Sequence, residues 1–424
     1  MSKSRTAIRG AALVGAAALL LTACSSDADD DPTQSPTSVE SPVEVGDGLV
    51  IGSLLPETGS LAFLGPPEIA GVDLAVAEIN EAGGVLGADV VHVSADSSDA
   101  DHADVAPQSW SDLQSQGISA VVGAASSSVT KLVVDDITNS ETVMISPANT
   151  ATSLSGYSPF YFRTAPPDTV QGSALGNLVV ADGITALGIL VFNEEYGTSL
   201  RDVIVETVEA AGVTVTYGKP GEEFDPAAAS FADAVTSVLA TAPEAIALVA
   251  FDQTKSIVPE LAAQGFTGSL YLVDGNTADY SADFDPGTLA AWNTQGTIPG
   301  AFPDDAFRER LLGVDPGLED FSYAAESYDA TILVALAALK GGATDGPTIQ
   351  ANLAAVSGAN GGTECTGFAE CAELVTAGEE IDYVAVSGAG PFNEANDPSS
   401  AFIGIYAYGE DNTYSWVKAV EGEA

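Results

Sequence analysis

"LVIGSLL" at residues 49–55, followed by "EIAGVDLAVAEINEAGG" at residues 68–84, sets the architecture from which the rest of the chain can be interpreted. The first is a short apolar run of the kind that forms a buried strand. The second spaces its apolar residues as a helix does and stops at a glycine pair. These apolar positions are Ile69, Val72, Leu74, Val76 and Ile79. A strand followed by a helix predicts the first half of a β-α-β unit.

The same alternation continues along the chain and then restarts. The next strands are expected at residues 88–95, 118–124 and 142–148, with helices over 105–116 and 130–139. A second set begins with "ITALGILVF" and is expected to have strands at residues 184–192, 213–218, 244–250 and 269–275, with helices over 196–211, 230–240 and 255–264. This order predicts an α/β fold with parallel sheets, helices on both faces and two lobes separated by a cleft.

Ligands of open parallel sheets bind beyond the carboxyl ends of the strands, so the residues that follow each strand are the candidate site. They carry hydroxyls, amides, aromatic rings and carboxylates. These residues are 56–59, 126–128, 147–150, 193–196, Phe251 with Asp252, and 274–276.

The segment "VVGAASSSVTK", residues 121–131, places three serines directly after one predicted strand. A serine nucleophile needs a neighbouring base, and the chain has only His92, which lies inside a predicted strand, and His102. A phosphate cradle would need a glycine-rich loop ending in lysine, which is absent here. A helix that opens at Ser126 or Ser127 would instead offer free N–H groups and hydroxyls to a small carboxylate.

Asp274, at a strand end in the other half, is the natural partner for an ammonium group. A zwitterion held by hydroxyls and amides on one lobe and by a carboxylate on the other satisfies both features. The local sequence "DGN" is equally compatible with an ordinary turn.

A cluster of acids with one histidine occupies residues 96–104. Its spacing does not match a calcium loop, and it precedes a predicted helix, where Asp and Ser act as caps. We therefore expect no metal and no cofactor.

The N-terminus indicates export. Basic residues precede an apolar stretch of eleven residues that ends at "LTAC", so residues 1–23 are predicted to be a lipoprotein signal peptide and Cys24 its lipidated residue. Residues 24–48 are rich in Ser, Asp, Pro and Thr and are expected to be a flexible tether. The protein would thus be anchored by lipid to the outer face of the cytoplasmic membrane.

Charge and cysteine content narrow the partners further. The formal net charge of −48 argues against nucleic acid. Cys365 and Cys371 lie six positions apart in an exported chain and are expected to form a disulfide, because no histidine or further cysteine supports a metal pair.

Residues 51–91 resemble the opening of the branched-chain amino-acid type of extracellular solute-binding proteins, the receptors of ABC importers. Further matching segments are "VVGAASSSVT", "VMISPANT", "YFRTAPPD", "NEEYGTSL", "ELAAQGF" and "SYDATILVALAAL". The resemblance extends from Leu49 almost to the C-terminus. It implies no catalysis, and it implies a type I periplasmic-binding fold of two Rossmann-like lobes joined by three crossovers that close on a ligand.

The resemblance also implies roles for individual residues. Ser127, Ala148 and Thr150 would hold the ligand's α-carboxylate and part of its ammonium, with Ser126 and Asp252 nearby. Tyr196 would cover the ligand and Asp274 would bind the ammonium. The chain departs from relatives at Leu64, where some carry an aromatic residue, and at Asp274, where leucine-type receptors carry a glutamate. Both departures affect the side-chain pocket.

By the same resemblance, one lobe would comprise residues 49–166 and 298–398, and the other 167–297 and 399–424. The crossovers would lie near residues 164–166, 294–298 and 396–400. We expect a monomeric receptor that captures an amino acid or similar small polar solute and delivers it to an ABC transporter permease. The alternative is a ligand-sensing cell-surface protein of the same fold that binds an amide, urea-like or aromatic compound without transport.

Overall fold

Two β-sheets organise residues 48–423, the part of the chain that the computed structural model describes. These residues belong to one compact unit that spans Val45–Ala424. The predicted signal peptide, the lipidation site Cys24 and all but the last residue of the predicted tether lie outside the described residues.

The first sheet has five parallel strands in the order β2-β1-β3-β4-β5. They are β1 (Val50–Leu55), β2 (Val91–Asp96), β3 (Ala120–Gly123), β4 (Val143–Ser146) and β5 (Tyr161–Arg163). Successive side chains of a strand point to opposite faces. Accordingly, Ile51 and Leu55 pack into one core, whereas Val50 and Leu54 pack into another.

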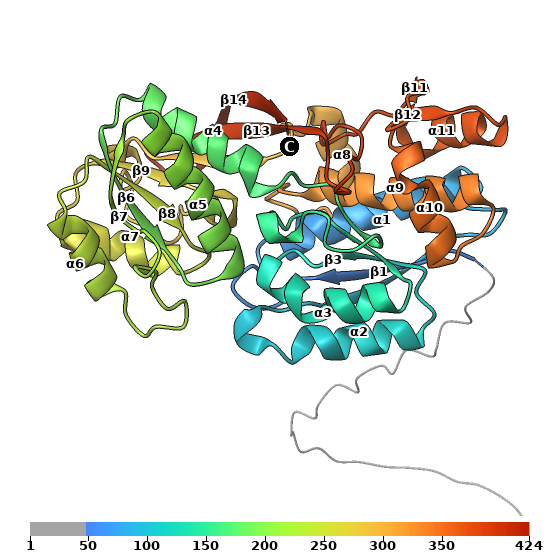
Figure 1. Cartoon of the computed structure of the whole chain (residues 1–424), viewed down its shortest axis with the longest axis horizontal. Coiled ribbons are helices and arrows are strands. Elements are labelled where there is room, and N and C mark those ends of the chain that lie inside the picture. The colour runs from blue at the N-terminus through green and yellow to red at the C-terminus, as the bar shows by residue number, and fades with distance from the viewer. Residues whose placement is uncertain (1–47, 424) are drawn as a thin grey trace, which may run out of the picture. The chain divides into compact units, whose positions relative to one another are not determined.

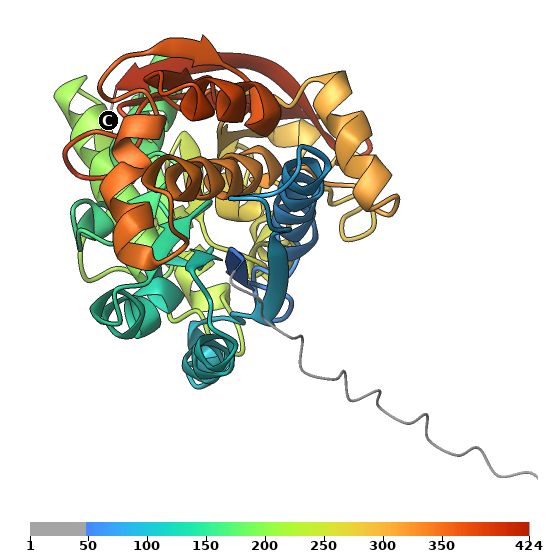
Figure 2. The ribbon, with the colours of Figure 1, turned by 90° about the vertical axis from the view of Figure 1, so that its right-hand side faces the viewer.

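Helices cover both faces of this sheet, as the alternating pattern predicts (Figure 1). The face with Ile51 is covered by α1 (Gly65–Glu81) and α9 (Ala324–Gly341), and the face with Val50 by α2 (Val105–Ser115) and α3 (Ser127–Asn139). Helices α1 and α9 lie side by side (Figure 2). They approach closely because α1 carries Gly71, where a Cβ would collide with the carbonyl of Ala324.

The second sheet has seven strands in the order β14-β13-β10-β9-β8-β6-β7. The bounds are β6 (Ala186–Val191), β7 (Thr214–Tyr217), β8 (Ala245–Val249), β9 (Ser269–Leu272), β10 (Gln295–Pro299), β13 (Ser400–Tyr408) and β14 (Tyr414–Glu423). Its helices are α4 (Asp168–Ala181), α5 (Glu195–Ala210), α6 (Ala232–Ala240) and α7 (Thr254–Ala263). Strands β6 to β10 pair in parallel, but β13 and β14 are antiparallel because they form a hairpin that turns at Asn412. The sheet is therefore mixed rather than purely parallel.

The remaining helices and strands extend the part of the molecule around α9, and the short 3₁₀ turns lie in loops. They are α8 (Asp305–Val314), α10 (Gly346–Val356), α11 (Gly367–Thr376), β11 (Thr363–Cys365), β12 (Ile381–Tyr383), and the 3₁₀ turns η1 (Ala100–His102), η2 (Thr152–Leu154), η3 (Asp274–Asn276) and η4 (Ala290–Trp292). Cys365 and Cys371 form the predicted disulfide, with their Cα atoms 5.3 Å apart.

The predicted α/β fold class is confirmed, and the six helices whose bounds were predicted (α1, α2, α3, α5, α6 and α7) begin and end within three residues of the prediction. The largest differences are at N-termini. Helix α1 begins at Gly65 rather than Glu68, because Pro66 and Pro67 fit a first helical turn. No helix between residues 48 and 423 combines the length and apolar content needed to cross a membrane.

A buried arginine ties two of the connecting segments together. Arg163 donates from Nε to Asp397 Oδ1 at 2.7 Å and from Nη1 to the Ala151 carbonyl at 2.9 Å. Its backbone N–H donates to the carbonyl of Asn396 at 3.1 Å. The segment after β5 and the segment before β13 are thus held side by side.

The segment expected to form the second crossover, residues 294–298, has a different structure. Residues 295–299 form β10, which pairs with β9 and β13, so the chain leaves the second sheet only after Pro299. Thr297 and Ile298 are β-branched and suit a buried strand. The lobes of residues 49–166 with 298–398 and 167–297 with 399–424 remain a prediction, and β10 extends two residues past the predicted boundary at residue 297.

Candidate functional site

A small cavity of about 20 Å³ lies between residues at the carboxyl ends of the two sheets. That volume holds roughly one water molecule. Six of the eight predicted ligand-binding residues line it. The lining residues are Leu61, Leu64, Ala125, Ser126, Ser127, Ala148, Asn149, Tyr196, Phe251, Asp274, Gly275 and Tyr323.

The three consecutive serines perform three different tasks at the N-terminus of α3. Ser126 is the N-cap, and its Oγ accepts from the backbone N–H three residues on at 3.3 Å. Ser127 Oγ accepts from the Ala151 N–H at 3.3 Å. Ser128 Oγ accepts from the N–H of Glu195 in α5 at 3.2 Å, so it connects the two sheets' elements. Only Ser126 and Ser127 face the small cavity.

The segment after β4 supplies Ala148 and Asn149 to the cavity wall. The Ala148 N–H donates to Ser146 Oγ at 3.3 Å. Thr150, in contrast, is fully buried and does not line the cavity. Its carbonyl accepts from the Asp168 N–H at 2.7 Å, and its hydroxyl has no hydrogen-bond partner among the described residues. Thr150 therefore lies behind the wall.

Asp274 is the charged group of the cavity and is surrounded by donors. Its Oδ1 accepts from Gln171 Nε2 at 2.7 Å and from the Tyr196 hydroxyl at 2.5 Å. Its Oδ2 accepts from the Tyr323 hydroxyl at 2.6 Å. Burial raises the pKa of Asp274 above its ordinary value, and these three donors act in the opposite direction. The donors fix the orientation of the carboxylate and favour its charged form.

Tyr323 is a site residue that the sequence does not reveal. It precedes α9 with a left-handed backbone, φ 59° and ψ 5°, which is an outlier for a bulky aromatic residue. Such strain persists where the surroundings impose it and clusters at ligand clamps. The conformation brings the Tyr323 hydroxyl to Asp274, although the two residues are far apart in sequence.

Further acids are buried close to this cavity. Burial raises the pKa of Asp168 to about 7, with the charge of Asp274 adding to the effect. Burial likewise raises the pKa of Glu194, at the start of α5, to about 7, and Asp101 and Asp99 act in the same direction. Both carboxyls therefore titrate near neutral pH and do not carry a full negative charge there.

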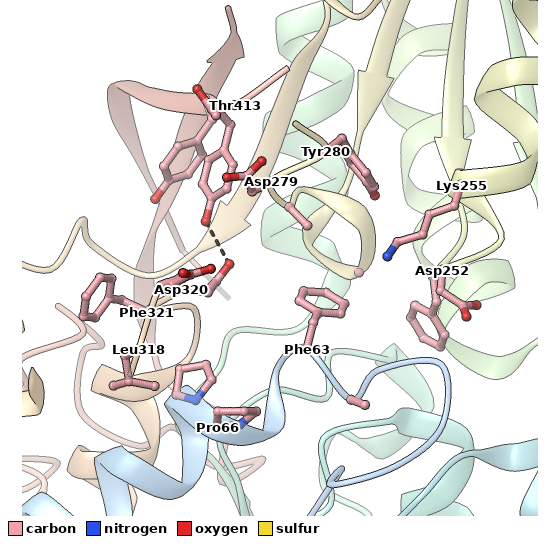
Figure 3. Close-up of a pocket in the computed structure, with 18 of the residues that line it drawn as sticks. Phe63, Pro66, Asp252, Lys255, Asp279, Tyr280, Leu318, Asp320, Phe321 and Thr413 are labelled. Atoms are coloured by element: carbon pink, nitrogen blue, oxygen red, sulfur yellow. Dashed lines mark hydrogen bonds between the residues drawn. The ribbon is translucent and has the colours of Figure 1, made fainter. Parts of the chain in front are cut away.

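Asp252 does not line the small cavity. It belongs to a larger cavity of about 800 Å³, here called the outer cleft, which shares Phe251 and Gly275 with the small one. Figure 3 shows Phe63 at its centre, between Asp252 and Lys255 on one side and Asp320 on the other. Leu64 and its neighbour Phe63 therefore face different cavities.

Direct hydrogen bonds join the elements of the two sheets beside the small cavity. The Thr152 N–H donates to Ser199 Oγ at 2.9 Å, and the Ser153 hydroxyl donates to Glu195 Oε1. Together with the Ser128 contact, they hold η2 and α3 against α5.

The site has the groups needed to bind but not those needed for covalent chemistry. His92 is engaged in structure, with Nδ1 2.6 Å from Asp73 Oδ1 and Nε2 2.8 Å from Ser53 Oγ. His102 contacts Asp99 through its Nδ1 at 2.7 Å. Neither histidine contacts a serine of the cavity, and residues 48–423 contain no group of three metal-binding side chains.

Comparison with known families identifies the class of protein. The family model described as "Periplasmic binding protein" matches residues 48–376. The chain belongs to the periplasmic binding protein family. This family protein is an exported solute-binding protein of the ABC-transporter type, and the expectation that it is not an enzyme is confirmed by its family.

Three similar proteins illustrate the range of the family. A chemotactic signal transduction system substrate-binding protein, BasB, from Halobacterium salinarum is 28% identical over 84% of this chain and 86% of the relative. LivJ from Streptococcus pneumoniae, a branched-chain amino acid transporter substrate-binding protein solved with isoleucine, has a TM-score of 0.68 at 21% identity, covering 89% of this chain and 100% of that one. A solute-binding protein from Rhodopseudomonas palustris, solved with p-hydroxybenzoic acid, has a TM-score of 0.70 at 14% identity, covering 89% and 98%. The two structural likenesses show the fold alone.

Proposed function

We propose that this periplasmic binding protein captures an amino acid, or a similar small zwitterion, between its two sheets. Asp274 binds the ammonium group. The N-terminus of α3, with Ser126 and Ser127, binds the carboxylate, while Ala148 and Leu64 pack against the ligand and Tyr196 covers it. The observation that carries the proposal is that Asp274, Ser126 and Ser127 line the same small cavity. Thr150 supports the site from behind its wall.

Closure of the two lobes supplies the affinity. An amino acid has about ten heavy atoms, so micromolar binding at about −8 kcal/mol needs close to 1 kcal/mol per atom, near the upper range for small ligands. Contacts on one exposed surface are too weak for that. Contacts on both sides, with water excluded, are strong enough. The interlobe bonds at Ser128, Thr152 and Ser153 form when the lobes close.

Delivery follows from closure. The closed monomer presents both lobes to an ABC transporter permease, which takes over the solute. The protein stays near the permease through lipid on Cys24. Replacing Cys24→Ser should move the protein from the membrane fraction to the soluble fraction, and its continued presence in the membrane fraction would contradict the lipid anchor.

A second candidate is a sensing role without transport. It is favoured by the relative BasB, whose name assigns it to a chemotactic signal transduction system. Such a receptor would use the same cleft for an amide, urea-like or aromatic compound. The ligand decides between the chemistries, because a benzoate lacks the ammonium that Asp274 would bind.

A thermal-shift screen followed by calorimetry tests the proposal. The ligands are the L-amino acids, urea, short amides and p-hydroxybenzoate. A ligand at 100 times its Kd stabilises the folded protein by about 2.7 kcal/mol. We expect shifts with amino acids that disappear in Asp274→Asn and persist in Asp233→Asn, which removes an exposed charge on α6. Shifts with p-hydroxybenzoate or urea alone would overturn the proposed ligand class.

A further inference from the structure

The outer cleft adjoins the small cavity and is far larger. The two share Phe251 and Gly275, and their volumes are about 800 Å³ and 20 Å³. Since the small cavity has room for roughly one water molecule, a ligand held on Asp274 extends its remaining atoms past Phe251 toward the outer cleft. The volume of the outer cleft is within the range of small-molecule sites. The residues that line the outer cleft therefore indicate the chemistry of the ligand's far end.

That wall is unusually aromatic. Eight of its 25 residues are Phe, Tyr or Trp, whereas these residues make up 7% of the chain. They come from both sheets' elements and include Phe63, Tyr280, Phe321, Tyr414 and Trp416. Phe63 occupies the middle of the view in Figure 3, with Tyr280 and Phe321 on either side. Such rings offer apolar contact and a negative π face.

Carboxylates complete the wall on both sides. Asp252 and Asp279 lie on the side of the second sheet, and Glu319 and Asp320 on the loop before α9. The two basic side chains of the lining are already paired with carboxylates outside it. Lys255 Nζ lies 3.5 Å from Asp283 Oδ1, and Arg308 pairs with Asp305. The charge that the lining of the outer cleft presents to a ligand is therefore negative.

A cationic side chain of the protein already lies against two aromatic rings of this wall. The guanidinium of Arg308 lies 5.1 Å from the centre of the Phe302 ring and 5.9 Å from that of Phe321. This cation–π arrangement, combined with a carboxylate, is the combination that binds organic cations. A neutral apolar group would leave the carboxylates unused, and an anion would be repelled by them. Only a positive group uses both kinds of residue.

We propose that the outer cleft binds a cationic group at the far end of the ligand, so that the captured solute is an amino acid with a basic side chain. The α-ammonium lies on Asp274, and the guanidinium or ammonium of the side chain lies among the aromatic rings and carboxylates of the outer cleft. This inference rests on the proposed function, because it needs Asp274 to bind the α-amino end.

Calorimetry on the mature protein with matched ligands tests the inference. L-Arginine and L-citrulline have nearly the same shape and differ in the charge of the side chain, and L-leucine represents a short side chain. We expect arginine to bind at least tenfold more tightly than citrulline or leucine. The double variant Asp252→Asn/Glu319→Gln should reduce this preference about tenfold with little change for citrulline. Asp233→Asn, which removes a charge remote from the cleft, should retain it.

The outcomes separate the two proposals. Equal affinities for arginine and citrulline, or tighter binding of leucine, overturn the inference about the outer cleft and leave the amino-acid function standing. Unchanged preference in the double variant also overturns it, with circular dichroism showing that the variant is folded. If no L-amino acid binds at all, the proposed function fails and the inference fails with it.

Discussion

Asp274 and Glu68 are both buried carboxyl groups, but their surroundings differ completely. Asp274 accepts hydrogen bonds from Gln171, Tyr196 and Tyr323 and lines a cavity. Glu68, on α1, is fully buried, and neither of its oxygens has a partner among the described residues. Burial alone thus does not define a binding carboxylate. The donors do, because they orient it and favour its charge.

Replacing each acid by its neutral amide should therefore have opposite consequences at the two positions. Asp274 is arranged to meet a cation, so a neutral substitute removes function. Burial raises the pKa of Glu68 well above its ordinary value, and the charge of Glu326 in α9 adds to this. Burial between α1 and α9 thus favours the protonated form of Glu68, and a neutral substitute should remove a source of instability.

The largest effect is expected for Asp274→Asn. The substitution keeps the shape and removes the charge that would pair with the ligand's ammonium, and truncating one partner of a buried charge pair costs about 2–5 kcal/mol. We expect affinity for L-arginine or L-leucine to fall about 100- to 1000-fold in calorimetry, with the fold retained. Asp233→Asn is the charge-matched control. Equal affinity in Asp274→Asn and the native protein would remove Asp274 from the site.

Glu68→Gln should be more stable than the native protein, by an amount that grows as the pH rises. The folded pKa of Glu68 is raised, so its stability contribution is full below the unfolded pKa near 4.3 and is lost as pH rises through the folded pKa. Between the unfolded and the folded pKa, the free energy of unfolding falls by about 1.4 kcal/mol for each pH unit. We expect the variant to be more stable than the native protein in urea unfolding at pH 8 and to match it near pH 4.

Glu81→Gln, on the exposed end of the same helix, is the control for Glu68→Gln. It should show no such pH dependence. A stability difference between Glu68→Gln and the native protein that is the same at pH 4 and pH 8 would show that Glu68 does not carry the proton, and the comparison with Asp274 would lose its basis.

The sequence predicted the strands, the helices and the strand-end residues because these depend on local periodicity. Residues such as Ser127, Ala148 and Asp274 follow strands directly, so a parallel sheet brings them to one edge. Asp252 also follows a strand, yet its side chain lies in the outer cleft, because strand position does not fix which cavity a loop residue faces.

The missed features depend on contacts between distant segments. Tyr323 reaches Asp274 through a left-handed backbone that no local pattern indicates. Gln171 lies inside α4 and contacts Asp274 only because α4 packs beside β10. The outer cleft combines loops near residues 60, 280, 320 and 415. The isolation of Glu68 likewise results from packing of α1 on α9, which sequence periodicity does not determine.

Tyr323→Phe probes the donors that distinguish Asp274 from Glu68. The substitution keeps the ring in the cavity wall and removes one hydrogen bond to a charged group, a bond of the kind that contributes about 1.5–3 kcal/mol. Since Gln171 and Tyr196 remain, we expect a loss near the lower end, about tenfold in affinity for L-arginine. The loss should be absent for an analogue without the α-amino group, such as 5-guanidinopentanoate. Equal weakening of both ligands would indicate a merely structural role.

Ser126 and Ser128 allow a similar comparison between two uncharged side chains. The expected effects on affinity and stability are the smallest of the series. Ser128 Oγ accepts from the Glu195 N–H across the lobes, whereas Ser126 caps α3 within one lobe. A single half-exposed neutral hydrogen bond contributes about 0.5–1 kcal/mol, so Ser128→Ala should weaken ligand binding roughly threefold with little change in Tm. Ser126→Ala should lower the free energy of unfolding by about 1 kcal/mol, as loss of a cap does, and should also weaken binding because Ser126 lines the proposed site. If Ser128→Ala lowers stability as much as Ser126→Ala and leaves affinity unchanged, the contact at Glu195 is a permanent part of the fold rather than one that forms when the lobes close.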